Sequence, residues 1–449
     1  MSELFDRIRS FFQSGRLRDL ILRATGGRFA VKVIGAGLAF ATEIALAHLL
    51  GVEEYGYYSY VWTWIFLLSI GGNLGFRKSL VKLVPEFQAD EAWDELKGLL
   101  RWSTRTVLLF TVGLALGGGL VAGWLTRSNP PLRRVFYVGF VALPLLSLVF
   151  VREGGLRGLK NIVRAEIPYR ILRPLLVIGG AGLLWFLRGE LTAYTTMWVT
   201  VGALGVGFAV ASYWLTLQSP DEVGAASLSY HGRSWLHETL PFLLISGTAL
   251  LNNKTDILML GILADTDAAG IYRATTRMTS LISYGLIAAN GIVAPLISQF
   301  HSDDEHEKLQ KMVSFATAGA AVFALGTTTV MIAFGETLLG LFGSEFTVGY
   351  TAMVILALGQ LANNVIGLVG SVMTMSGRQW TATRVFGGAA LANIVLNAIL
   401  IPFFGMPGAA VASATTMVGW NSTLCWLSIR ELDLNPSAFG IIRYLRSRN

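Results

Sequence analysis

The sequence predicts an all-α polytopic membrane protein of about twelve transmembrane helices, in two parallel six-helix lobes around a central cleft. Three observations carry this prediction. Apolar residues make up 53% of the 449 residues and charged residues only 14%, whereas soluble domains carry about 25% charged residues. Apolar stretches long enough to cross a membrane recur along the whole chain. The two halves of the chain also repeat short patterns at an offset of about 213 residues.

Each predicted span holds roughly the 20 mostly apolar residues that cross the hydrocarbon core. The spans lie near 31–50, 57–76, 106–126, 135–151, 171–187, 191–217, 239–263, 272–296, 312–335, 349–375, 385–403 and 407–429. The first contains Lys32 and Glu43, and the fourth is short. An even number of spans places both termini on the same side of the membrane.

The basic residues indicate which side that is. With a cytoplasmic N-terminus, the inner tails and loops hold most of the Lys and Arg, whereas the outer loops hold only about four, namely Arg127, Arg133, Arg134 and Arg188. The sequence therefore predicts a multi-pass protein of the cell membrane with both termini in the cytoplasm. The net charge of +7 is then a topology signal and requires no nucleic-acid partner.

The predicted organisation has five parts. Apolar residues at helical spacing between charged ones predict an amphipathic interfacial segment at the N-terminus. The parts are this segment at 1–28, an N-lobe at 29–217, a polar cytoplasmic linker at 218–235, a C-lobe at 236–430 and a cytoplasmic tail at 431–449.

The internal repeat supports the two lobes. The matching stretches are 49–58 with 262–272, where Gly56 matches Gly270, then 87–96 with 300–309, and 155–161 with 376–380. Because each half has an even number of spans, the two copies share one orientation. Parallel repeats of this kind place a substrate site between the halves near the membrane midplane, and transport proceeds by rocking one half against the other.

Two stretches carry a resemblance to a known family. The phrase LNNKTDILMLGILADTDAAGIYRAT at 251–275 and the phrase GMPGAAVASA at 405–414 resemble the polysaccharide transport branch, the Wzx-type oligosaccharide flippases, of the multidrug/oligosaccharidyl-lipid/polysaccharide exporter superfamily. The resemblance implies a carrier that moves polyprenyl-diphosphate-linked oligosaccharides from the cytoplasmic to the outer leaflet. It also implies an alternative, because other members of the superfamily export amphiphilic cations in exchange for Na⁺ or H⁺.

Ionisable residues inside spans are candidates for function, because each costs about 2.5–3.5 kcal/mol on insertion scales. Those in this chain are Lys32, Glu43, Arg173, Lys254, Asp256, Arg273 and Arg277. Glu43 and Asp256 differ by the repeat offset, so they occupy matching positions and are candidate carboxylates for a coupling ion. The alternative is that each neutralises a nearby cation, which for Asp256 is Arg277.

A diphosphate head group requires cations, and guanidinium groups bind phosphate through two parallel hydrogen bonds. Arg273 and Arg277 lie one helical turn apart and so share a face. The candidate head-group residues are Arg273, Arg277, Lys254 and Lys32. For Lys32 and Arg273 the alternative is that the long side chain reaches the membrane interface.

Amide side chains suit sugar hydroxyls because they donate and accept hydrogen bonds at once. The candidate sugar path is Asn252, Asn253, Gln360, Asn363, Asn364, Asn393, Asn397 and Asn73. The alternative for any one of them is an interhelical hydrogen bond.

Missing motifs exclude transport driven by ATP bound to this chain and a metal cluster held by cysteines. No Gly-Lys dipeptide occurs, so the chain has no P-loop, and the single Cys425 excludes a cysteine metal cluster. We therefore predict a flippase that is not an enzyme and has no metal site and no cofactor beyond a coupling Na⁺ or H⁺. Its predicted partners are membrane lipids, a polyprenyl-diphosphate-linked glycan, and a glycan polymerase or glycosyltransferases. An ion-coupled antiporter of amphiphilic cations remains the alternative.

Overall fold

The computed structural model describes residues 15–303 and 305–440, without the side chains of 15–29, 241, 244–253, 292, 295, 301 and 302. The described chain is helical and contains no strand, which confirms the predicted all-α class. It forms two compact units, described here one at a time. Unit 1 comprises Met1–Leu49 and Ile65–Gly247, and unit 2 comprises Leu50–Trp64 and Thr248–Asn449. The boundary therefore runs through two long helices, α2 (Gly15–Gly72) and α10 (Gly232–Leu263).

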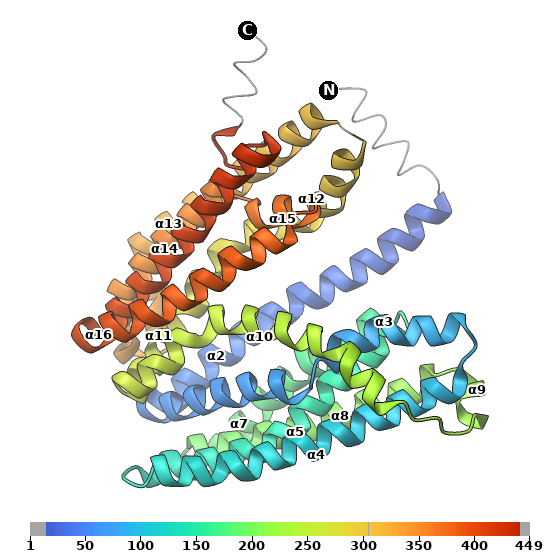
Figure 1. The fold of residues 1–449 in the computed structure, drawn as a ribbon. Coiled ribbons are helices and arrows are strands. Elements are labelled where there is room, and N and C mark those ends of the chain that lie inside the picture. Colours follow the sequence, from blue (N-terminus) through green and yellow to red (C-terminus); the bar gives the residue numbers. More distant parts are fainter. Residues whose placement is uncertain (1–14, 304, 441–449) are drawn as a thin grey trace. The chain divides into compact units, whose positions relative to one another are not determined.

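Unit 1 is a bundle of long helices connected by short turns (Figure 1). Besides its parts of α2 and α10, it contains α3 (Phe76–Ala89), α4 (Trp93–Leu125), α5 (Pro130–Gly158), α6 (Ile162–Ile167), the π-helix η1 (Pro168–Leu172), α7 (Arg173–Arg188), α8 (Ala193–Gln218) and α9 (Asp221–Ala225). A buried apolar cluster joins α3, α4, α5 and α10, where Phe76, Leu96, Leu148 and Trp235 are among the buried residues.

Unit 2 contains the remaining helices. They are α11 (Thr266–Thr279), the 3-10 helix η2 (Ser280–Ser283), α12 (Tyr284–Ser302), α13 (His306–Gly340), η3 (Ser344–Gly349), α14 (Tyr350–Ile366), α15 (Val369–Met375) and α16 (Gln379–Leu432). Gly405 interrupts α16 with a φ of 56°, a conformation that costs glycine little. Figure 1 shows the resulting two arms of α16. A buried cluster that includes Ile297, Val313 and Val372 joins α12, α13 and α15.

Twelve membrane passes can be traced through these elements. Eight described helical segments are long and apolar enough to cross a membrane, and two of them each contain two passes, because α2 is interrupted at Gly51 and α16 at Gly405. The helix α10 and the run α11–η2–α12 supply the other two passes. The predicted twelve-helix fold is thereby confirmed.

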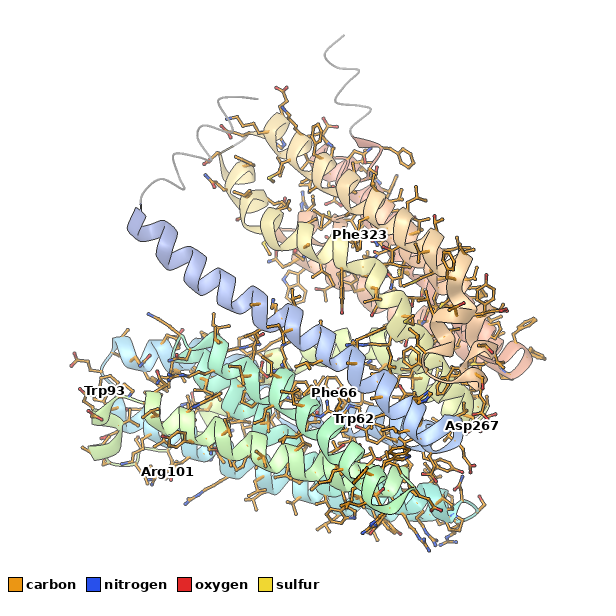
Figure 2. The ribbon with its side chains drawn as sticks, turned by 180° about the vertical axis from the view of Figure 1, so that it is seen from behind. Trp62, Phe66, Trp93, Arg101, Asp267 and Phe323 are labelled. Carbon is orange, nitrogen blue, oxygen red and sulfur yellow. The ribbon has the colours of Figure 1, made fainter. Side chains whose placement is uncertain are left out.

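The outer faces of these helices carry the exposed apolar side chains that lipid contact requires. Leu120 on α4 is 78% exposed, Phe186 on α7 80% and Phe403 on α16 79%. Figure 2 shows the side chains around the helices, Phe323 of α13 among them, and Phe323 is 48% exposed. Because exposed apolar surface of this extent is unfavourable in water, the chain is a multi-pass membrane protein.

The structure differs from the sequence-based expectation at several helix ends. The predicted short span at 135–151 is the 29-residue helix α5, and 72% of its apolar 18-residue stretch is buried. The predicted loop at 218–235 contains α9 and the first turn of α10. The predicted span at 349–375 is divided at Gly367, where φ is 90°. Residues 1–14 of the predicted interfacial segment lie outside the described residues, and from Gly15 the chain already continues as α2. The five-part division stays a prediction.

The repeat is visible in equivalent turns. The first matching pair of stretches meets inside unit 2, where Gly56 of α2 packs against Gly270 of α11, so that a Cβ on Gly270 would lie 2.8 Å from the Cα of Gly56. The third pair forms the turn between α5 and α6 and the turn between α15 and α16. Each of these turns contains a positive φ, 62° at Lys160 and 80° at Gly377.

Candidate functional site

Asp256 lies in unit 2 on α10, and its carboxylate is bound by three side chains from two other helices. Oδ1 accepts a hydrogen bond of 2.9 Å from the amide of Asn397. Oδ2 accepts one of 3.1 Å from the hydroxyl of Tyr272 and another from the hydroxyl of Ser413. Tyr272 belongs to α11, while Asn397 and Ser413 belong to the two arms of α16. The turn at Gly405 therefore brings both arms of α16 to one carboxylate.

Asn393 and Thr416 extend the hydrogen-bond network around this carboxylate. The amide of Asn393 lies 3.3 Å from the hydroxyl of Ser413 and 3.4 Å from that of Thr416, and its Oδ1 accepts from Asn397 at 3.0 Å. Among the described residues, the buried Oδ1 of Asn397 receives no hydrogen bond. We call Asp256, Tyr272, Asn393, Asn397, Ser413 and Thr416 the Asp256 centre.

The chemistry of the Asp256 centre suits a small cation. It combines one carboxylate with neutral amide and hydroxyl oxygens, the ligands that hard cations prefer. A buried carboxylate is stable when it is paired with a cation or protonated. One carboxylate balances one positive charge, so the centre can hold a monovalent cation or a proton.

The matching carboxylate, Glu43, is half-buried on the part of α2 that belongs to unit 1. Asp256 belongs to unit 2. A shared coupling role for Glu43 and Asp256 therefore stays a prediction, as does the ion pair between Asp256 and Arg277.

The structure places the candidate head-group cations on three helices. Arg273 and Arg277 both lie on α11, as their spacing predicts. Nη1 of Arg273 donates to the carbonyl oxygen of Ser59 at 3.3 Å and to the hydroxyl of Thr63 at 3.1 Å, both on the part of α2 in unit 2. Lys254 is half-buried on α10, and Lys32 is exposed on the part of α2 in unit 1. Their binding of a head group stays a prediction.

Some of the candidate amides form a connected set within unit 2. Gln360 and Asn363 on α14 lie 3.4 Å apart. Gln360 accepts from the hydroxyl of Ser283 at 2.8 Å, and Asn363 accepts from the amide of Asn421 on α16 at 2.9 Å. Asn364 donates to the carbonyl oxygen of Gln360 within its own helix. These amides therefore connect η2, α14 and α16 by hydrogen bonds.

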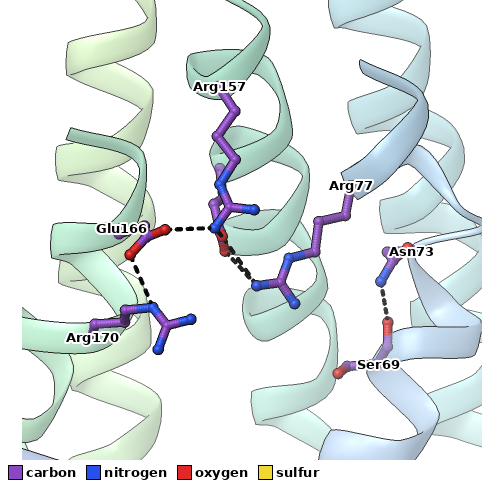
Figure 3. Close-up of polar contacts among 7 residues, drawn as sticks. Ser69, Asn73, Arg77, Arg157, Glu166 and Arg170 are labelled. Atoms are coloured by element: carbon purple, nitrogen blue, oxygen red, sulfur yellow. Dashed lines mark hydrogen bonds and ion pairs between the residues drawn. The ribbon is translucent and has the colours of Figure 1, made fainter. Parts of the chain in front are cut away.

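The candidate amides Asn393, Asn397 and Asn73 make other contacts. Asn393 and Asn397 belong to the Asp256 centre. Asn73, in unit 1, donates to the carbonyl oxygen of Ser69 at 3.1 Å (Figure 3). It also accepts from the backbone N–H of Gly75 at 3.1 Å, so it shapes the turn between α2 and α3. Asn252 and Asn253 lie outside the residues whose side chains are described.

A set of five charged residues in unit 1 was missed by the sequence reasoning, which placed 152–164 in a cytoplasmic loop. We call it the Arg–Glu cluster, and Figure 3 shows it with its contacts. Its members are Arg77 at the start of α3, Glu153 and Arg157 in the last turns of α5, Glu166 in α6 and Arg170 in η1. The i,i+4 spacing of Glu153 with Arg157 and of Glu166 with Arg170 is the signal that would have indicated it.

The two glutamates of the cluster are 2% and 1% exposed, and each contacts two arginines. Glu153 lies 2.9 Å from Nη2 of Arg77 and 2.6 Å from Nη2 of Arg157. Glu166 lies 3.0 Å from Nη2 of Arg157 and 3.3 Å from Nε of Arg170. These ion pairs let charged residues occupy the ends of buried helices, because a buried charge requires a partner.

A family model and a curated relative that match this chain both concern polysaccharide or glycan biosynthesis. The family model described as "Polysaccharide biosynthesis protein" matches residues 21–301. A protein of Haloferax volcanii described as "Probable low-salt glycan biosynthesis flippase Agl15" is 24% identical over 396 residues, which cover 86% of this chain and 79% of that protein.

Two solved structures share the fold. A multidrug resistance MATE family transporter of the MOP superfamily, in an inward-facing conformation, has a TM-score of 0.74 at 14% identity and covers 90% of this chain and 97% of its own. The lipid II flippase MurJ, in an inward closed conformation, has a TM-score of 0.71 at 14% identity and covers 93% of this chain and 91% of its own. Because the family model matches more than half of the chain, this protein belongs to the polysaccharide biosynthesis protein family, as its resemblance in sequence predicted.

Proposed function

We propose that the chain is a flippase that moves a lipid-linked oligosaccharide from the cytoplasmic to the outer leaflet of the cell membrane. The observation that carries the proposal is the similarity to a glycan biosynthesis flippase over 86% of the chain. The chain also shares its fold with a lipid II flippase, and this shared fold is consistent with the proposal. Such transport makes and breaks no covalent bond, so the chain acts without enzymatic chemistry.

The charges within the predicted spans favour an anionic substrate. Five are basic, at Lys32, Arg173, Lys254, Arg273 and Arg277, and two are acidic, at Glu43 and Asp256. In our proposal, basic residues bind the diphosphate, amides such as Gln360 and Asn363 contact the sugars, and the lipid tail stays in the bilayer. The termini are cytoplasmic, and glycosyltransferases or a glycan polymerase supply or consume the substrate.

The membrane potential is the proposed driving force. One charge that crosses the membrane gains about 2.3 kcal/mol per 100 mV. A head group with a charge near −2 that leaves a negative cytoplasm gains about twice that free energy. Loss of the potential should therefore slow outward transport, and an unchanged rate after addition of an uncoupler would contradict this driving force.

We further propose that the Asp256 centre binds the coupling ion, Na⁺ or H⁺. Its carboxylate accepts hydrogen bonds from two helices, and both arms of α16 contribute to it. Occupation of the centre by a cation would pull these helices together. In this way, ion binding can change the packing of unit 2 during transport.

The first experiment measures transport directly. The purified chain is reconstituted in liposomes with a fluorescent polyprenyl-diphosphate oligosaccharide, and its accessibility to an external quencher is followed. We expect transport by the wild type, and its loss in the double variant R273A/R277A if these arginines bind the head group. Arg384→Ala is the matched control, because Arg384 is exposed on α16 of the same unit. If the double variant still transports the lipid, the flippase proposal stands and these two arginines do not bind the head group.

The antiporter alternative has one observation in its favour, the fold shared with a MATE family transporter. The same liposomes test it. Exchange of an amphiphilic cation for Na⁺ or H⁺, without movement of the lipid, would replace the flippase proposal.

A further inference from the structure

The Arg–Glu cluster contains more positive than negative charge. Three arginines surround two buried glutamates, so the cluster has a formal charge of +1. The cluster therefore carries one positive charge that its two glutamates do not neutralise.

The arginines also keep hydrogen-bond donors available. Arg170 contacts Glu166 through Nε, and one of its two Nη groups points toward the side where the guanidinium of Arg77 lies (Figure 3). The side chains of Arg77, Arg157 and Arg170 are 28%, 26% and 39% exposed, so a ligand can reach them.

Each arginine is held in place. The guanidinium of Arg77 lies 4.1 Å from the centre of the Phe150 ring, which fixes its plane. Arg157 contacts both glutamates. Arg170 belongs to a π-helix, a distortion that is frequent at functional sites, and α2 passes so close that a Cβ on Gly35 would lie 2.9 Å from the Cβ of Arg170. Guanidinium groups fixed in this way lose little entropy when they bind an anion.

The cluster lies where unit 1 makes its short turns, between α5 and α6 and between α2 and α3. The positive-inside rule places these turns on the cytoplasmic side. A substrate that enters from the cytoplasmic leaflet has its diphosphate at that level.

We propose that Arg77, Arg157 and Arg170 form an anion site for the diphosphate of a polyprenyl-diphosphate substrate. This inference rests on the proposed function and names the cytoplasmic side of unit 1 as the place of head-group capture. Arginine suits this ligand because its planar fork binds two phosphate oxygens at once. The sugar and the lipid tail contribute nothing to this part of recognition.

The test measures binding of geranylgeranyl diphosphate to the full chain in detergent, by isothermal titration calorimetry. Geranylgeraniol, which has the same tail and no phosphate, is the control ligand. We expect binding of the diphosphate only, and competition by inorganic diphosphate. The variants R77Q and R170Q should each weaken binding at least tenfold, and R170K, which keeps the charge and loses the fork, should also weaken it.

Arg164→Gln is the matched control variant. Arg164 lies on α6, two residues from Glu166, and makes no contact within the Arg–Glu cluster. It should bind within twofold of the wild type. Equal losses in R164Q and R170Q would mean a general charge effect and would overturn the anion site, as would wild-type affinity in R77Q and R170Q, or no binding of the diphosphate by the wild type.

Transport on the same preparations separates the two proposals. If the wild type moves the lipid-linked oligosaccharide while R170Q binds the diphosphate normally, the anion site is wrong and the flippase stands. If R77Q and R170Q lose diphosphate binding while the wild type moves no lipid, the anion site stands and the flippase is wrong.

Discussion

At the scale of single residues, the Asp256 centre surrounds one carboxylate of unit 2 with buried polar side chains. Asn393 is 3% exposed, and Tyr272 and Asn397 are fully buried. A carboxylate in such surroundings is stabilised by its three donors, and in its ionised form it carries a charge that hydroxyls and amides do not cancel. The ion that cancels this charge should therefore stabilise the folded chain.

Sodium should raise the thermal stability of the wild type relative to choline at equal ionic strength. At a concentration ten times its dissociation constant, a single bound ion contributes about 1.4 kcal/mol. The variant D256N keeps the size of the side chain and loses its charge, so the sodium effect should disappear. The measurement is thermal unfolding in detergent across a sodium series.

Asp265→Asn is the control for this prediction. Asp265 caps α11 in the same unit by accepting from the N–H of Ala268 at 2.6 Å, and Asn caps a helix about as well as Asp. D265N should keep the sodium effect. A wild type that responds equally to sodium and choline would favour a proton as the coupling ion.

The sequence predicted part of this centre. Asp256 was identifiable because a carboxylate is rare in a span, and Asn393 and Asn397 because they lie one turn apart. Ser413 and Thr416 were missed, because their stretch is rich in Gly and Ala and is typical of helix packing. Helical spacing identifies the residues that share one face of a helix. Packing decides which helices face each other, and the spacing does not show it.

At the scale of helices, the contact between α2 and α11 within unit 2 depends on two glycines that match in the repeat. A Cβ on Gly56 would lie 2.6 Å from the carbonyl oxygen of Thr266, and one on Gly270 would lie 2.8 Å from the Cα of Gly56. Small residues allow helices to approach this closely in membranes. The same close approach holds Ser59 and Thr63 within reach of Arg273.

Gly270→Ala should destabilise the chain by about 1–3 kcal/mol, because the added methyl group meets backbone that cannot move aside easily. Gly319→Ala is the control, because Gly319 lies in the middle of α13 with no neighbouring atom within 4 Å of an added Cβ. Alanine there should stabilise the helix by about 0.5–1 kcal/mol. Thermal unfolding of the two variants measures both effects, and equal stability of the two variants would contradict the close packing.

Helix lengths were predicted less well than helix number. The periodic apolar segments identified all twelve passes, but α5 continues to Gly158, beyond the predicted end at 151. Hydropathy treats Glu153 and Arg157 as polar and ends the span before them. The structure buries Glu153 because Arg77 and Arg157 neutralise it, and an ion pair between distant segments is invisible to a local hydropathy average.

At the scale of the whole chain, the segment between the two predicted lobes is attached to unit 1. The backbone N–H and the hydroxyl of Ser227 each donate to the carboxylate of Asp94 at 2.7 Å. Lys97 donates to the carbonyl oxygens of Gly224 and Ala226 at 2.8 and 2.6 Å. The sequence predicted a polar linker between the lobes, and these bonds attach the segment to the start of α4.

Asp94→Ala should release this segment. We expect cleavage within 219–231 by a protease of low specificity to become at least several-fold faster than in the wild type, because the backbone loses the bonds that hold it. Glu95→Ala removes the neighbouring acidic residue and should leave the rate unchanged. Limited proteolysis followed by mass spectrometry identifies the cut, and equal rates in both variants would mean that Asp94 does not hold the segment.

The long sequence separation within the Asp256 centre has a consequence for synthesis. Asn397 follows Asp256 by 141 residues, which a ribosome adds in roughly 7 to 30 s at 5–20 residues per second. During that interval α10 reaches the translocon with its carboxylate and without α16. A helix that carries an acidic residue inserts less readily, so α10 should be retained beside the translocon until the last two helices emerge. A nascent chain that stops before α16 would then be a substrate for membrane quality control.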